Sequence, residues 1–275
     1  MIKLDGTDNK SHLGANAMLA VSLANVQAGA NDKKLQLFEY IYKYLHPQSP
    51  LANRYSMPVP MMNILNGGSH ADNTIDIQEF MIIPINFSNY TDALKAGTEI
   101  FHSLKTILKK RGLSTSIGDE GGFAPLLNNN EEALELIVEA IIRAHYKPEK
   151  DIVLALDVAA SEFYNKQNNT YYLESENTKL TPLELIGYYE KLCANYPIVS
   201  IEDGLDQNDW MSWQELTARL GNKVQIVGDD LTVTNPLLLQ KAIQKKAMNA
   251  ILIKLNQIGT FTETINAITL AQENN

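Results

Sequence analysis

The sequence is poor in cysteine: Cys193 is the only one among its 275 residues. An intrachain disulfide is therefore impossible, and we expect a reducing location, the cytoplasm, where thiols stay reduced. We expect Cys193 itself to be a buried apolar side chain. With 45% hydrophobic residues, the chain is long enough to bury a large core without covalent cross-links.

Long apolar runs and excess basic charge are also missing. The first ten residues, MIKLDGTDNK, have no apolar stretch of signal-peptide length, and no later run approaches the roughly 20 apolar residues of a membrane helix. We therefore expect a soluble protein with no membrane insertion. The net charge of −9 argues against nucleic acid as a partner, because affinity for phosphates comes largely from clustered Lys and Arg. The basic run at 109–111 ends a helical pattern before Gly112, where cations suit a helix C-terminus.

From about Asp151 onward, apolar strands alternate with amphipathic helices. Thr181-Pro182 and Asn235-Pro236 each combine an N-cap residue with proline at the first helical position. Strands are predicted at 152–157, 198–203, 225–230 and 250–256. Several consecutive strand-helix units predict an α/β fold, either a parallel (β/α) barrel or a doubly wound sheet.

The preceding part of the chain has a different pattern. Residues 1–53 are predicted to be helical, and a proline-rich loop suggests a domain boundary near Arg54. The second domain then covers 54–275. It begins with predicted strands at 59–65 and 77–84 and a long helix at 90–111.

Charged residues stand at the carboxyl ends of the predicted strands, which is where parallel barrels and sheets carry functional side chains. They are Asp157, Glu202 with Asp203, Asp229 with Asp230, and Lys254. Three neighbouring acidic strand ends repel one another unless a cation neutralises them, and Mg²⁺ prefers such oxygen ligands. The alternative is that these carboxylates cap helices or face solvent.

Lys254 follows the apolar run AILI, which we interpret as a strand covered on both faces. Burial lowers the pKa of a lysine, and a neutral amine beside a metal site can take a proton from carbon. The alternative is a structural ion pair, since ion-pair networks also perturb lysines.

Two glycine-rich loops could complete such a site. In GDEGGFAP, residues 118–125, the glycines around Asp119 and Glu120 allow a tight bend that points the carboxyl groups into a cavity, so Glu120 could act as an acid. NGGSHADN carries His70, which is a weaker candidate because a loop histidine is often simply solvated.

Together the segments NGGSHADN, IQEFMI, GDEGGFAP, LALDVAASEFY, YPIVSIEDGLDQNDW, QIVGDDLTVTN and ILIKLNQIGT resemble the enolases, the phosphopyruvate hydratases. The resemblance implies an enolase-type (β/α)8 barrel preceded by the helical part of an α+β N-terminal domain. It also implies a Mg²⁺-dependent lyase that reversibly dehydrates 2-phosphoglycerate to phosphoenolpyruvate in glycolysis and gluconeogenesis. Homodimers are usual in the family.

The resemblance also implies residue roles. Lys254 is then the base and Glu120 the general acid. Mg²⁺ is held by Asp157, Glu202 and Asp229. The substrate pocket is lined by His70, Gln78 and Glu79, together with Glu202 and Asp229.

The family pattern extends beyond both ends of this sequence, which we interpret as a central fragment of an enolase. The family's Ser-containing mobile loop, its last two barrel strands, an SHRSGE-type segment and a later lysine have no counterpart here. A catalytically incomplete fragment is therefore one alternative. Another is a secreted or cell-surface protein that binds partners through Lys241, Lys245 and Lys246. A third is a different member of the superfamily, against which the GDEGGFAP and SHADN loops argue.

Overall fold

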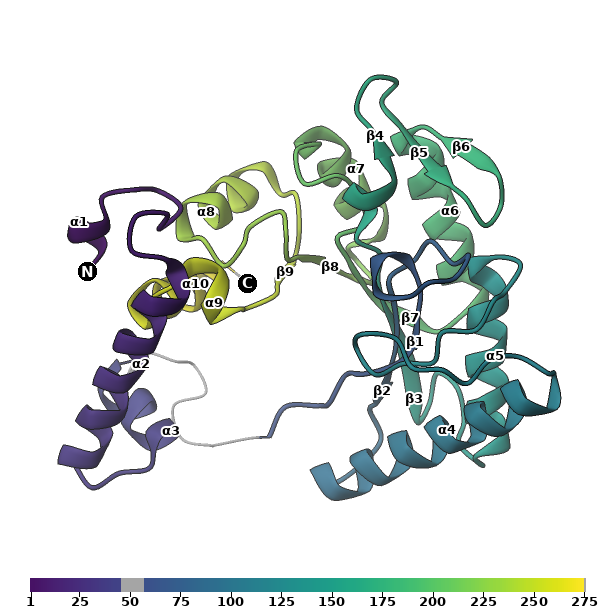
Figure 1. Cartoon of the computed structure of the whole chain (residues 1–275), viewed down its shortest axis with the longest axis horizontal. Coiled ribbons are helices and arrows are strands. Elements are labelled where there is room, and N and C mark those ends of the chain that lie inside the picture. Colours follow the sequence, from purple (N-terminus) through teal and green to yellow (C-terminus); the bar gives the residue numbers. More distant parts are fainter. Residues whose placement is uncertain (46–56, 275) are drawn as a thin grey trace. The chain divides into compact units, whose positions relative to one another are not determined.

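The computed structural model describes residues 1–45 and 57–274, and the chain divides into two compact units (Figure 1). The central unit comprises Met57–Ile226, and the split unit combines Met1–Ser56 with Val227–Asn275. Arg54, where the sequence suggests a domain boundary, lies outside the described residues. The division into 1–53 and 54–275 stays a prediction.

The central unit is built on a sheet that begins antiparallel and becomes parallel. Its strands are β1 (Met62–Asn66), β2 (Glu79–Pro84), β3 (Ile152–Asp157) and β7 (Ile198–Glu202). β1 with β2 and β2 with β3 pair antiparallel, whereas β3 and β7 pair parallel. Every residue of β3 is buried, as its continuous apolar sequence predicts for a strand covered on both faces.

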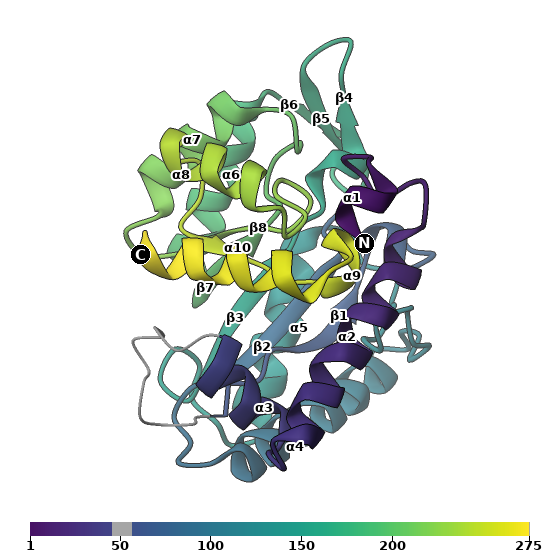
Figure 2. The same ribbon diagram turned by 90° about the vertical axis from the view of Figure 1, so that its left-hand side faces the viewer.

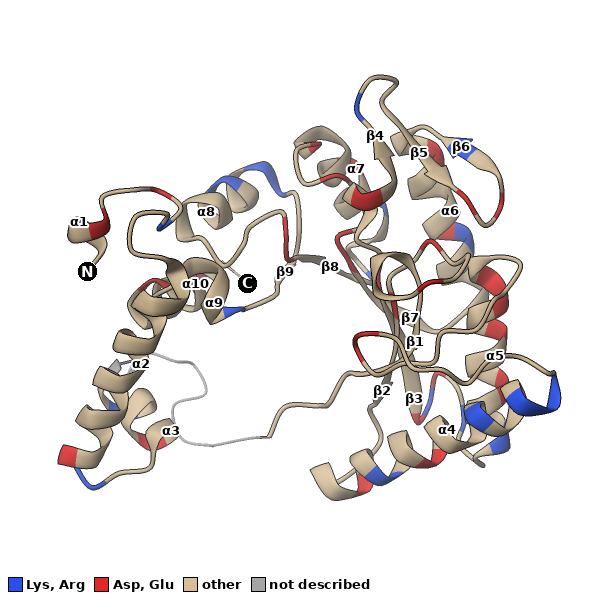
Figure 3. Ribbon diagram, in the orientation of Figure 1, with Lys and Arg blue, Asp and Glu red and all other residues tan. Residues whose placement is uncertain are grey.

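The same unit contains amphipathic helices. They are α4 (Tyr90–Lys110), α5 (Asn130–Arg143), α6 (Pro182–Asn195) and α7 (Trp210–Leu220). α4 packs against β2 and α5. The predicted N-cap at Thr181 is confirmed, because its side chain accepts a hydrogen bond from the Glu184 N–H. The Glu184 side chain accepts the Thr181 N–H in return, which completes a capping box. Lys109 and Lys110 occupy the last turn of α4, and Figure 3 shows this basic end in blue.

A small second sheet follows β3 and was not predicted from the sequence. After a 3-10 turn at Ala160–Phe163 come β4 (Tyr164–Asn165), β5 (Thr170–Leu173) and β6 (Thr178–Leu180), paired antiparallel. Its strands are two to four residues long and its turns are rich in Asn. Such short segments give almost no periodic signal.

The split unit joins helices from both ends of the chain. Its elements are α1 (Ile2–Asp5), α2 (Ala15–Asp32), α3 (Leu37–Tyr40), a π-helical turn (Ile41–Leu45), α8 (Pro236–Lys245), β9 (Ala250–Ile251), α9 (Leu255–Ile258) and α10 (Phe261–Glu273). β8 (Gln225–Gly228) runs into this unit and pairs parallel with β9. α2 packs against α9 and α10, both of which Figure 2 shows. Lys10 Nζ, almost fully buried, lies 3.0 Å from Glu263 Oε1 and ties the N-terminal segment to α10.

The strand predicted at 250–256 is much shorter than expected. β9 contains two residues, and Leu252 and Ile253 are only half-buried because the chain leaves the sheet before α9 begins at Leu255. The prediction of a strand covered on both faces is therefore wrong, and the Lys254 side chain is 46% exposed.

Cys193 also differs from the prediction of a buried residue. It is half-buried, because it lines an open cleft of about 740 Å³ together with Tyr196, Pro197 and Lys223. Removal from water still raises the pKa of its thiol to about 11.

Among the described residues, no helix combines the length and the apolar character that crossing a membrane requires.

Candidate active site

Three carboxylates lie side by side at one end of the central sheet. Glu79 of β2 is in register with Asp157 of β3, and Asp157 is in register with Glu202 of β7. In-register neighbours point to the same face of a sheet, so these side chains share one surface. Asp157 and Glu202 are only 8% and 7% exposed. The strand pairing thus concentrates negative charge, largely shielded from water, at the site that the sequence predicts.

Gln78 and the backbone hold this row in place. The Gln78 side chain donates a hydrogen bond from Nε2 to Asp157 Oδ2 at 3.1 Å. The other oxygen of Asp157 accepts the Ala159 N–H at 3.2 Å, and the Val158 N–H donates to the Glu202 carbonyl at 3.0 Å. These contacts fix the direction of the Asp157 carboxylate.

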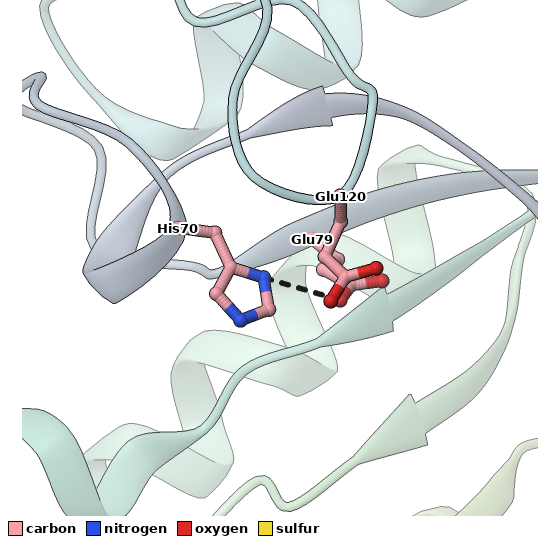
Figure 4. Close-up of side chains that lie close together, drawn as sticks. All are labelled: His70, Glu79 and Glu120. Carbon is pink, nitrogen blue, oxygen red and sulfur yellow. Dashed lines mark ion pairs between the residues drawn. The ribbon is translucent and has the colours of Figure 1, made fainter.

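A second cluster brings together His70, Glu79 and Glu120, as Figure 4 shows. Each offers a ligand atom within 4.8 Å of the others, and His70 Nδ1 lies 3.3 Å from Glu79 Oε1. Glu120 is exposed, whereas His70 and Glu79 are partly buried. Because Glu79 belongs to both the row and the cluster, the cluster lies directly beside the carboxylate row.

The loop that carries Glu120 is held close to the loop that carries His70. The Asp119 N–H donates to the His70 carbonyl at 3.0 Å. A Cβ atom on Gly118 would lie 2.7 Å from that same carbonyl oxygen, so only glycine allows this approach. Gly121 has φ +85°, a backbone conformation that favours glycine. The glycines flanking the acidic pair thus allow the predicted tight bend, while Asp119 and Glu120 themselves are exposed.

The His70 loop is also anchored on its other side. The Ser69 hydroxyl donates to Glu162 at 3.0 Å, which joins this loop to the turn that follows β3. Further along the loop, Asn130 Oδ1 accepts the N–H groups of Asp76 and Ile77, each at 3.1 Å. Asn130 is fully buried at the start of α5, so the segment that leads into Gln78 and Glu79 is tied to a helix.

Lys254 and Asp229 form a pair within the split unit. Lys254 Nζ makes an ion pair with Asp229 Oδ2, and Gln257 Nε2 donates to Asp229 Oδ1 at 2.7 Å. Asp229 is only 5% exposed, and a buried carboxylate needs partners close by. Lys254 and Gln257 provide them. The structural ion pair that the sequence left open as an alternative for Lys254 is therefore present.

The predicted site residues thus fall into two groups. His70, Gln78, Glu79, Glu120, Asp157 and Glu202 belong to the central unit, and Asp229 and Lys254 belong to the split unit. Sequence reasoning missed Gln257, Glu162 and Asn130. Gln257 follows Lys254 by three residues at the start of a helix, and that spacing could have indicated a shared face. Glu162 and Asn130 contact the site loops from distant positions and leave no local signal.

Two family models match this chain: one described as the enolase N-terminal domain at residues 1–41, and one described as the enolase C-terminal TIM barrel domain at residues 54–275. The chain belongs to the enolase family. The second match confirms the barrel-type α/β fold class that the resemblance implies. The function follows at the level of the family, an enolase-type lyase acting on a small molecule.

The enolase family implies Mg²⁺, and the donor set of this chain fits that ion. Asp157 and Glu202 offer carboxylate oxygens on adjacent strands, without a sulfur or imidazole ligand beside them in the register. Two largely buried carboxylates on one face repel each other and favour a hard cation between them.

Proposed function

We propose that this enolase-family chain is a Mg²⁺-dependent lyase that reversibly dehydrates 2-phosphoglycerate to phosphoenolpyruvate. The observation that carries the proposal is the junction at Glu79, where the row with Asp157 and Glu202 meets the cluster with His70 and Glu120. One side of this junction suits a cation and a bound carboxylate. The other side offers an acid and hydrogen-bonding groups for a hydroxyl.

The proposed reaction uses two residues of the chain for proton transfer. Lys254, as a neutral amine, takes the proton from C2 of 2-phosphoglycerate, and the electron pair stays on the substrate. Glu120 then donates a proton to the C3 hydroxyl, the C3–O bond breaks, water leaves and the C2–C3 double bond forms. Asp157, Glu202 and Asp229 would hold Mg²⁺, which when bound would stabilise the negative charge that develops on the substrate carboxylate.

Other residues bind and orient the substrate in this proposal. His70 and Glu79 each offer a ligand atom within 4.8 Å of one on the proposed acid Glu120, and in this proposal they bind the hydroxyl and phosphate region of the substrate. Gln78 keeps Asp157 directed through its 3.1 Å hydrogen bond. Gln257 gives Asp229 a hydrogen-bond partner besides Lys254, so the carboxylate stays oriented when Lys254 loses its charge.

The direct test is phosphoenolpyruvate formation from 2-phosphoglycerate by the purified chain, with Mg²⁺ and after its removal by a chelator. We expect Mg²⁺-dependent turnover that Lys254→Ala abolishes and Glu120→Gln reduces by roughly 10²- to 10⁴-fold, the usual contribution of general acid catalysis. Lys241→Ala, on α8 of the same unit, is the matched control and should retain turnover. Equal turnover in Lys254→Ala and the unmodified chain would remove Lys254 from its role.

The remaining family properties are part of the same proposal. We expect a homodimer and a cytoplasmic protein, because both are usual among enolases. Sedimentation equilibrium of the purified chain measures the first, and a monomer at all concentrations would contradict it.

A further inference from the structure

The turn between β8 and α8 is strained in an unusual way. Val233 and Thr234 have φ values of 42° and 56°, so two consecutive β-branched residues adopt the left-handed region. A single β-branched residue with positive φ is already an outlier, because its side chain crowds the backbone. Such strain persists where surrounding contacts fix the conformation, and it concentrates at functional sites.

Several hydrogen bonds hold this turn in its strained form. The Asp229 carbonyl accepts the N–H groups of Thr232 at 3.1 Å and Val233 at 2.7 Å. The Thr232 hydroxyl donates to the Gly228 carbonyl at 3.1 Å, and the Asn235 N–H donates to the Thr232 carbonyl at 2.7 Å. The turn is therefore built onto the residue that carries the Asp229 carboxylate.

The strained backbone places the Thr234 hydroxyl next to Lys254. Thr234 is fully buried, and its Oγ1 accepts the Lys254 backbone N–H at 2.8 Å. The same oxygen lies 3.3 Å from Gln257 Oε1 and 3.4 Å from the Leu252 carbonyl oxygen, and it can donate its single proton to either acceptor. Gln257 in turn donates to Asp229, and Lys254 pairs with Asp229, so the contacts connect four residues of the split unit in a ring that includes the Lys254 backbone amide.

We propose that Thr234 is a positioning residue for Lys254: its hydroxyl fixes the Lys254 backbone and, through Gln257, the direction of the Asp229 carboxylate. The inference rests on the proposed function for the catalytic meaning of that position, but the contacts themselves do not. A threonine that only filled space would need neither a left-handed backbone nor a hydroxyl aimed at this amide.

The test separates the hydroxyl from the shape of the side chain. Thr234→Val keeps the β-branched shape and removes the hydroxyl, whereas Thr234→Ser keeps the hydroxyl. Thr264→Val is the matched control, because Thr264 is also a buried threonine of the split unit and its hydroxyl donates to the Thr260 carbonyl at 2.9 Å. The chain is labelled with ¹⁵N,¹³C-lysine, and the Lys254 signals are assigned by their absence in Lys254→Ala.

Two signals are measured at one fixed pH. Exchange of the Lys254 amide hydrogen should be about threefold to tenfold faster in Thr234→Val, which has lost the acceptor, and normal in Thr234→Ser and Thr264→Val. The Lys254 side-chain ¹³Cε shift should move in Thr234→Val toward its value in Asp229→Asn. Unchanged exchange and shift in Thr234→Val would overturn the proposal, as would equal changes in Thr264→Val.

Kinetics supply the catalytic half of the test. We expect Thr234→Val to lower kcat by about tenfold to hundredfold at nearly constant KM, and Thr234→Ser to restore it, because misplacing a reacting group affects the transition state most. If the unmodified chain shows no turnover, the proposed function fails while the resonance measurements still decide the positioning role. Altered resonances with unchanged kcat would overturn the inference and leave the proposed function standing.

Discussion

Replacing Asn130 by alanine should destabilise the central unit far more than replacing its neighbour Asn129. Asn130 Oδ1 accepts two buried N–H groups, those of Asp76 and Ile77, and its Nδ2 donates to Asp76 Oδ2 at 3.0 Å. In Asn130→Ala both N–H groups lose their hydrogen-bond partner at a position that is fully buried. The substitution therefore removes the hydrogen bonds that tie α5 to the segment that leads to Glu79.

The magnitude follows from the two unpaired amides. Leaving a buried donor unsatisfied costs about 1–3 kcal/mol, so the free energy of unfolding should fall by about 2–6 kcal/mol. That is a large part of the 5–15 kcal/mol that is typical of a folded domain, on the order of a third. Asn129 caps α5 by accepting the Glu132 N–H at 2.8 Å, and Asn129→Ala should cost only about 1 kcal/mol.

Urea unfolding followed by tryptophan fluorescence measures both variants. The two tryptophans of the chain, Trp210 and Trp213, lie in the central unit, so the signal reports on that unit. We expect a much lower midpoint for Asn130→Ala than for Asn129→Ala, with the dependence on urea unchanged. Equal losses of stability in the two variants would show that the buried amides of Asp76 and Ile77 do not depend on Asn130.

Two further predictions concern a pair of glycines and the single cysteine. Gly118→Ala should lower the free energy of unfolding by about 1–3 kcal/mol and impair turnover, because its Cβ would lie 2.7 Å from the His70 carbonyl oxygen. Gly187→Ala, inside α6 with nothing within 4 Å of the new Cβ, should instead stabilise by about 0.5–1 kcal/mol. Thermal melts of the two variants measure both effects, and the reverse order of stability would contradict the packing. Cys193, with its thiol pKa raised to about 11, is mostly neutral at pH 8 and should react with iodoacetamide about twentyfold more slowly than free cysteine, a balance of fewer thiolates against greater intrinsic nucleophilicity. Its reaction rate should rise as the pH approaches 11, and a rate equal to that of free cysteine at pH 8 would show that burial does not protect it.

The sequence predicted the strands with strong, continuous apolar character. β3 is found at its predicted residues and β7 ends one residue early, because a strand buried on both faces leaves an unmistakable apolar run. β9 was overestimated, since the run AILIKLN continues into the start of α9 and an apolar run alone does not show where a chain leaves a sheet.

The candidate site was predictable only where residues carry their own local signal. The acidic strand ends and the glycine-flanked Glu120 stand out in the sequence, and β-sheet register explains why Asp157 and Glu202 are neighbours. Thr234 and Asn130 could not be identified, because their roles depend on backbone amides far away in the chain, or on φ angles that no residue pattern specifies.

In the proposed reaction Lys254 takes the C2 proton before Glu120 acts on the leaving hydroxyl. This order is tested by exchange of the C2 hydrogen of 2-phosphoglycerate with deuterium from solvent, followed by NMR in the presence of Mg²⁺. We expect exchange with the unmodified chain, exchange without phosphoenolpyruvate formation in Glu120→Gln, and neither in Lys254→Ala. Exchange that persists in Lys254→Ala but disappears in Glu120→Gln would contradict the assignment of base and acid.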